Sequence, residues 1–130
     1  MFGFDSFFKK GLKNTVEFKN NSGFTFGGPI IPLKGQPRID RWHTGEFSSA
    51  EYTVSINYDE NNREIIKFLL VATPDTAKIA VYSRIASNID MVDVEAILNN
   101  AYVDLHLVPK SSKFETAKIT FNVNYFKNHV

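Results

Sequence analysis

The sequence predicts an all-β protein, an antiparallel β-sandwich that follows an N-terminal arm. Apolar and polar residues alternate with a period of two in several runs after Gly45, and short polar turns separate these runs. The stretch Val92–Val108 has the pattern of a hairpin with one wholly apolar face. Residues 27–38 hold three glycines and three prolines, more than a regular element tolerates. We therefore divide the chain into an arm, residues 1–45, and a sandwich domain, residues 46–130.

The arm is predicted to begin with a short amphipathic helix within residues 1–14. Phe4, Phe7, Phe8 and Leu12 fall on one helical face, and three lysines turn away from it. Two glycines in this segment each cost about 1 kcal/mol relative to alanine, so the helix needs a partner surface. That surface is on its own domain, on another subunit or on a membrane.

Two further segments of the arm carry apolar side chains. Thr15–Lys19 and Phe24–Phe26 alternate around a turn and predict a small hairpin, which must lie against something to be stable. Residues 27–38 favour an extended segment in a groove of the same subunit or of a neighbour. Our hypothesis is that apolar residues of the arm anchor contacts with partner proteins: Phe4, Phe7, Phe8, Leu12, Ile30, Ile31 and Leu33.

The sandwich domain begins with a half-buried strand at Tyr52–Tyr58. Glu64–Ala72 is apolar on both faces except for Lys67, which fits a central strand or a buried helix, and the flanking turns favour the strand. A third strand is predicted at Ala77–Ile85. After the hairpin at 92–108 and a polar loop at 109–116, the last strand runs from Ala117 to Phe126, with four side chains facing inward: Ile119, Phe121, Val123 and Tyr125.

The hairpin at 92–108 is predicted to turn at Asn99-Asn100, because asparagine tolerates the positive φ that two-residue turns demand. A slip of one residue would place carboxylates on the apolar face, so the pattern is predicted to fix the register. A second sheet must cover that face, because an isolated hairpin is marginal in water. The apolar pairs in this register are Leu98–Ala101, Ala96–Val103, Val94–Leu105 and Val92–Leu107.

The other face of this hairpin carries a cluster of titratable side chains: Asp93, Glu95, Asp104 and His106. In the predicted register Glu95 lies directly opposite Asp104, and like charges in that position destabilise a sheet unless they are neutralised. Carboxylates at this spacing could hold a divalent cation such as calcium. The simpler interpretation is that a lysine of the neighbouring last strand, such as Lys118, screens them.

Composition excludes several functional classes. The chain has 130 residues, 43% hydrophobic and 22% charged, which suits one packed domain. A net charge of +1 gives no electrostatic case for binding nucleic acid or anionic membranes. The absence of cysteine excludes disulfides and thiol nucleophiles and fits a reducing cytosol. The sequence also lacks an apolar run of membrane-spanning length. Its first residues lack the apolar region of a signal peptide, so we do not expect secretion by the usual signal.

Motifs for catalysis are also missing. His43, His106 and His129 stand in no metal-ligand or nucleophile motif, and the glycines form no phosphate loop. We expect no enzymatic activity, no cofactor and no metal. Five aromatic residues could form a carbohydrate-stacking face, although aromatic residues in β domains are more often core: Phe47, Tyr52, Tyr82, Tyr102 and Phe126.

A spaced set of short motifs carries a more specific signal. It opens with Arg41–Thr53 and continues with these segments: Glu64–Lys67, Val71-Ala72, Val81–Arg84, Val103–Leu105, Lys118-Ile119 and Tyr125-Phe126. Over residues 41–126 this set resembles a β module of small virion structural proteins from T4-like tailed phages, notably those that infect marine cyanobacteria. The resemblance carries no catalytic or ligand-binding residues to this chain.

The resemblance implies a non-enzymatic virion subunit, made in the host cytoplasm and built into the tail, baseplate, neck or fibre attachment. Its expected partners are other virion proteins and copies of itself, bound through the arm and through strand edges. Nucleic acid, membranes and small-molecule substrates are not expected partners. The alternatives are a capsid decoration protein and a glycan-binding module at a fibre tip.

Overall fold

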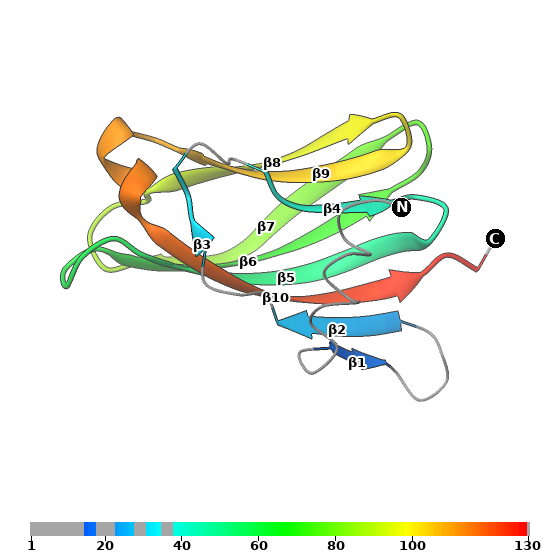
Figure 1. Cartoon of the computed structure of the whole chain (residues 1–130), viewed down its shortest axis with the longest axis horizontal. Helices are drawn as coiled ribbons and strands as arrows, with labels where there is room; N and C mark the ends of the chain where they lie inside the picture. The colour runs from blue at the N-terminus through cyan, green and yellow to red at the C-terminus, as the bar shows by residue number, and fades with distance from the viewer. Residues whose placement is uncertain (1–14, 18–22, 28–30, 35–37, 130) are drawn as a thin grey trace.

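A computed structural model describes residues 15–17, 23–27, 31–34 and 38–129. It confirms the predicted all-β class: two antiparallel sheets form a sandwich, drawn as two layers in Figure 1. The predicted helix within residues 1–14 lies outside the described residues. Among the described residues, no helix is long and apolar enough to cross a membrane.

The larger layer, sheet A, has the strand order β1-β2-β10-β5-β6-β7, and β3 pairs with the first residues of β10. The strands of sheet A are β1 (Thr15–Glu17), β2 (Gly23–Gly27), β3 (Ile31–Pro32), β5 (Phe47–Asn57), β6 (Arg63–Ala72), β7 (Ala77–Ala86) and β10 (Lys118–Lys127). The smaller layer, sheet B, has the order β4-β9-β8. Its strands are β4 (Arg38–His43), β8 (Val92–Asn99) and β9 (Tyr102–Pro109).

The strands before residue 46 belong to both sheets. The small hairpin predicted from its alternation forms as β1 and β2, and β2 pairs with β10 from Asn122 to Phe126. β4 forms one edge of sheet B and pairs with β9. The expected boundary at residue 45 therefore does not separate the strands of the sandwich from the described part of the arm.

The core fills the space between the two sheets with alternate side chains of each strand. The burial of β6 alternates strictly along its length, as a strand requires and a buried helix does not. The four side chains predicted to face inward from the last strand are at most 4% exposed. Aromatic rings dominate the centre: Tyr52 stacks on Phe68 at 5.0 Å between centroids, and Phe47 stacks on Tyr125 at 4.9 Å.

The segment predicted as a polar loop after β9 contains a short 3-10 helix, η2 (Ser112–Thr116). Its Phe114 is buried and meets the ring of Tyr58 edge-on at 5.2 Å. This aromatic contact closes one end of the sandwich.

The β8–β9 turn lies one residue later than predicted. Asn100 and Ala101 occupy the two central positions with φ values of 51° and 69°, and Asn99 pairs with Tyr102. Leu98 therefore faces Val103 instead of Ala101. Because the partner of each β8 residue moves by two positions, every side chain keeps its predicted face, and only the pairs change.

Candidate interaction surface

The outer face of β6 is unusually apolar for a surface. Ile65, Leu69 and Val71 are 44%, 49% and 52% exposed, and they alternate with core residues of the same strand. On β7, Ile85 pairs with Ile65 and is 68% exposed. A strand that is apolar on both faces is typical of a sheet covered on both sides, but sheet B covers only the inner face of β6. Leu69 and Val71 are neighbours on this face, and Lys67 separates them from Ile65. Exposed apolar side chains of this kind make the face a candidate site of interaction.

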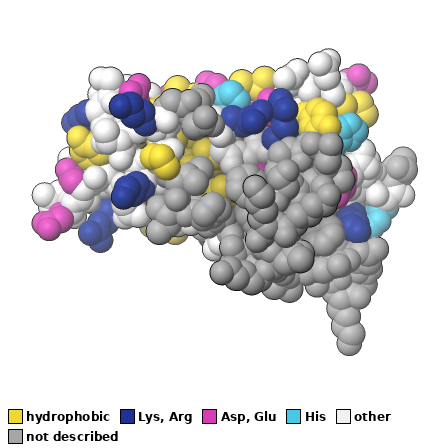
Figure 2. Space-filling view, viewed as in Figure 1, with side chains coloured by type: hydrophobic (Ala, Val, Ile, Leu, Met, Phe, Trp, Pro, Cys, Tyr) yellow, Lys and Arg dark blue, Asp and Glu magenta, His cyan; other side chains and the backbone are white. Residues whose placement is uncertain are grey.

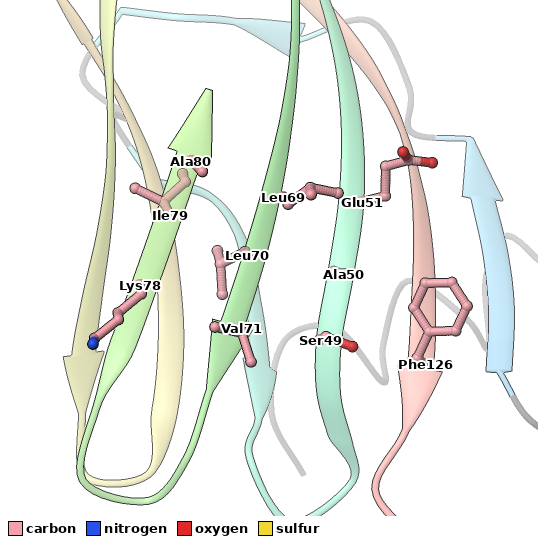
Figure 3. A pocket seen from close by; sticks show the side chains of 10 residues that line it. All are labelled: Ser49, Ala50, Glu51, Leu69, Leu70, Val71, Lys78, Ile79, Ala80 and Phe126. Atoms are coloured by element: carbon pink, nitrogen blue, oxygen red, sulfur yellow. The ribbon is translucent and has the colours of Figure 1, made fainter. Parts of the chain in front are cut away.

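A hollow of about 590 Å³ opens in this face, across β5, β6 and β7 up to the end of β10. We call it the outer hollow, and Figure 3 shows its lining. Ser49 of β5 pairs with Val71, and Ala80 of β7 pairs with Leu69, so small side chains alternate with larger ones across the strands and lower the floor. Its lining residues are Ser49, Ala50, Glu51, Leu69, Leu70, Val71, Lys78, Ile79, Ala80 and Phe126.

Polar side chains border the outer hollow at one end. Tyr82 is an extra residue at a bulge in β7, and its hydroxyl donates to Glu51 Oε2 of β5 at 2.9 Å. Asn124 Nδ2 lies 3.5 Å from Glu51 Oε1. The hydrogen bond to the Glu51 carboxylate raises the pKa of Tyr82 above its ordinary value. The border of the hollow is therefore polar, whereas most of the side chains that line it are apolar.

A buried polar network joins the two sheets on the opposite side of sheet A. Asp40 of β4 accepts hydrogen bonds at Oδ2 from the hydroxyls of Tyr52 at 2.7 Å and Tyr125 at 2.5 Å. Its Oδ1 accepts from the Arg41 N–H at 2.9 Å, and the Trp42 indole N–H donates to the Tyr52 hydroxyl at 3.0 Å. Each of these polar groups thus has a partner in a space closed to solvent.

The surroundings of Asp40 change its acidity. Burial raises its pKa from 3.8 to about 6, against the opposing effect of the hydrogen bonds from Tyr125, Tyr52 and Arg41. Burial also raises the pKa of both tyrosine hydroxyls well above 10.0, and the Asp40 carboxylate adds to this effect. Because these groups are enclosed between the layers, the network is suited to holding the sheets together and not to acting on a substrate.

The titratable cluster predicted on the hairpin is divided among separate partners. Glu95 lies opposite His106 and not Asp104, which corrects the predicted register. Arg41 of β4 binds both oxygens of Asp104, with Nε–Oδ1 at 2.6 Å and Nη2–Oδ2 at 3.1 Å. Asp93 lies 3.6 Å from the Lys110 ammonium.

The prediction that a lysine of the last strand screens this cluster is therefore wrong. The strand next to β9 is β4, so an arginine of β4 neutralises Asp104, and Lys118 on β10 belongs to the other sheet. Within the described ranges, no group of three or more His, Asp or Glu side chains is arranged to hold a metal ion. A bidentate guanidinium occupies the carboxylate that a cation would need.

The seven predicted partner-binding residues are placed only in part. Phe4, Phe7, Phe8, Leu12 and Ile30 lie outside the described residues. Ile31 belongs to β3 and pairs with Ile119 of β10. Leu33 donates its N–H to the Ala117 carbonyl, and its side chain is 2% exposed in the core of this chain. Leu33 is thus a core residue of its own domain, which corrects its assignment to a partner.

The five aromatic residues considered for carbohydrate stacking do not form one face. Phe47 and Tyr52 are core residues, whereas Tyr82 and Phe126 lie on the outer side of sheet A and are 51% and 43% exposed. Tyr102 is half-buried and meets His43 edge-on at 4.9 Å. These positions on different sides of the molecule give no shared stacking shelf.

Charge is mixed on the face shown in Figure 2, where Lys and Arg side chains stand among Asp, Glu and hydrophobic ones over the described residues. The outer hollow could have been anticipated only from the apolar residues on both faces of Glu64–Ala72. The same pattern also predicts a central strand.

Comparison with known proteins gives two similarities. No family model matches the chain. Protein DML1 of Scheffersomyces stipitis is 26% identical over 129 residues, which cover 92% of this chain and 24% of that protein, so the chain spans about a quarter of that relative. The tailspike protein of Acinetobacter phage vB_ApiP_P1 aligns in structure with a TM-score of 0.40 and 9% identity, over 78% of this chain and 19% of that one.

Proposed function

We propose that this chain is a non-enzymatic structural subunit of a phage virion, in the tail, baseplate, neck or fibre attachment. The observation that carries the proposal is the exposed apolar outer face of sheet A with its hollow, since an apolar hollow in a sheet face is a surface that a partner can cover. The spaced motifs over residues 41–126 add the phage context through their resemblance to a virion β module.

The inside of the sandwich supports a structural role. Its buried carboxylates are engaged in bonds that tie strands together: Asp40 joins β4 to β5 and β10, and Glu64 joins β6 to β7 and to the start of β8. A general acid or base must instead reach a substrate from a cleft. Binding through surfaces is the function that this arrangement favours.

Two further contact regions follow from the sequence and the topology. The free edges of the described sheets are β1 and β7 in sheet A and β4 and β8 in sheet B, and an edge can pair with a strand of a neighbour. The apolar residues of the arm other than Leu33 remain predicted contacts with neighbouring subunits: Phe4, Phe7, Phe8, Leu12, Ile30 and Ile31.

The test is the content of purified particles. Mass spectrometry of virions from an infected culture should detect this chain, and cryo-electron microscopy should place its sandwich against neighbouring subunits. If the chain is abundant in the lysate and missing from washed particles, the proposal is wrong.

A pair of variants supplied from a plasmid tests the surface itself. Leu69→Ser with Val71→Thr should fold normally and be depleted from particles, because both side chains are half-exposed on the outer hollow. Ile89→Ser removes an equally exposed apolar side chain from the loop before β8, away from the hollow, and should be incorporated as the wild type is. Equal incorporation of both variants would contradict a role for the hollow.

A further inference from the structure

We propose that copies of this chain bind one another head to tail, with the outer face of β8 of one copy seated on the outer hollow of the next. The inference rests on the proposed structural role and names the neighbour and the two surfaces. The β8 surface consists of Asp93, Glu95 and Ile97, which alternate on the side of sheet B that faces away from the core.

The first support is an apolar residue that matches an apolar site. Ile97 is 42% exposed although it lies within a strand. The outer hollow offers Leu69 and Val71, which are similarly exposed. A single protruding aliphatic side chain is the kind of group that a shallow apolar hollow accepts, and its burial would remove apolar surface from water on both copies.

The second support is charge complementarity. On the β8 surface the charged side chains are the acids Asp93 and Glu95. The outer faces of β6 and β7 carry the bases Lys67 and Lys78. Glu95, Lys67 and Lys78 make no ion pair within the described part of the chain. Asp93 lies 3.6 Å from Lys110 of its own chain, so the complementarity rests on Glu95 of the β8 surface and on Lys67 and Lys78. The acid that lines the hollow, Glu51, is engaged by the Tyr82 hydroxyl.

Charge also selects the mode of association. If two copies met through the same outer face of sheet A, Lys67 and Lys78 of each would approach the lysines of the other. Contact between the β8 surface and the outer hollow brings lysine to carboxylate instead. This contact is heterologous, because it uses two different surfaces of the same chain.

The position of the two surfaces allows the contact to repeat. They lie on opposite outer faces of the two-layer sandwich, and Figure 1 shows the β6–β7 and β8–β9 turns at the same end of it. A copy that is bound through its β8 surface keeps its outer hollow available for another copy. Repetition gives a ring if the rotation closes and a filament if it does not, and both are arrangements that a virion uses for many copies of one subunit.

Charge reversal provides the first test, with the mass of the purified full chain measured by light scattering and sedimentation over a range of concentrations. The mass of the wild-type assembly should exceed that of a dimer as the protein concentration rises. Lys78→Glu and Glu95→Lys should each weaken assembly by about tenfold or more, and the double variant should recover most of the loss. Ile89→Glu, placed in the loop before β8, should assemble as the wild type does.

Mixing of two defective variants provides the second test. Ile97→Glu keeps an intact hollow, Val71→Glu keeps an intact β8 surface, and each alone should stay monomeric. An equimolar mixture should form dimers and stop there, because each pair uses one intact surface of each kind. Circular dichroism should show the wild-type fold for both variants, since both substitutions are at exposed positions.

Three outcomes would overturn the inference: a wild type that is monomeric at all concentrations, an assembly that no charge reversal weakens, or a mixture that does not pair. If Ile97→Glu is nevertheless incorporated into virions at the wild-type level, another virion protein occupies the hollow, and the structural role stands without self-stacking. If the chain is missing from particles, the structural role fails independently of these measurements.

Discussion

The two faces of β6 differ in environment and hardly in composition. Ile66, Phe68 and Leu70 point into the sandwich and are at most 1% exposed. Ile65, Leu69 and Val71 point outward and are about half exposed. Sheet B lies over the first set, and no second sheet covers the other among the described residues. The inner face stabilises this fold, and the outer face is the surface that we propose binds a partner.

Charged side chains on the inner and outer sides of sheet A also differ in their partners. Inside, Glu64 accepts from Arg84 Nε at 2.5 Å and from the Met91 N–H at 2.8 Å, and Arg84 also donates to the Val92 carbonyl. Outside, Lys67 and Lys78 have no ion pair within the described chain. The charges inside the fold are paired within the subunit, and the lysines that we assign to association are not.

The largest difference between the two faces is expected from truncating adjacent residues of β6. Phe68→Ala should lower the free energy of unfolding by about 3–5 kcal/mol, because it leaves a cavity where the ring stacks on Tyr52. Leu69→Ala should change it by no more than about 0.5 kcal/mol. Urea titrations of both variants measure these values, and a cost for Leu69→Ala near that for Phe68→Ala would mean that the outer face is part of the core.

A second comparison uses two cationic residues of β7. Arg84→Ala should cost about 3 kcal/mol, since it leaves the fully buried Glu64 carboxylate without its guanidinium partner. Lys78→Ala should stay within about 0.5 kcal/mol and should weaken self-association instead. Chemical unfolding paired with sedimentation separates the two effects. Equal losses of unfolding free energy in the two variants would contradict the proposed difference between the inner and outer faces of the sheet.

Asp40 provides a pH-dependent test of the inner face. Its pKa is raised from 3.8 to about 6 in the folded protein, so between these values the folded state binds more protons than the unfolded state. Stability from this group is therefore present at low pH and is lost as pH rises through about 6, by up to about 3 kcal/mol.

Asp40→Asn isolates that contribution. The difference in unfolding free energy between wild type and variant should change by up to about 3 kcal/mol from pH 4 to pH 7, in favour of the wild type at pH 4. Other carboxylates titrate in both proteins and cancel in the difference. A difference that does not change with pH would show that Asp40 is not desolvated between the sheets.

The smallest effect is expected at the β8–β9 turn, which belongs to neither face of β6. Ala101 has a φ of 69°, a conformation that costs an L-residue about 1–2 kcal/mol. Ala101→Gly should stabilise the protein by about 0.5–1 kcal/mol after the extra freedom of glycine in the unfolded chain is counted. Asn100→Gly should gain less, because asparagine tolerates this conformation. Thermal unfolding of the two variants gives the comparison.

Patterns along the sequence were enough to predict most strands after Gly45 and the faces of their side chains. The alternation in Tyr52–Tyr58 and Ala117–Phe126 places the same residues inward in the structure, and the hairpin at 92–108 keeps its apolar face despite the changed turn. Period-two patterning is a local property of a strand, so a single sequence is enough to reveal it. The conformation of residues 1–14 stays a prediction.

The order of the strands, and the apolar face that the described residues leave uncovered, follow from the packing of the whole chain. Asp104 pairs with Arg41, 63 residues away, because β4 and not β10 is the neighbour of β9. Leu33 is buried for the same reason, since its backbone bonds to Ala117. Long-range pairing depends on the packing of the whole chain. The alternation within one strand does not indicate which strand lies beside it or which layer covers it.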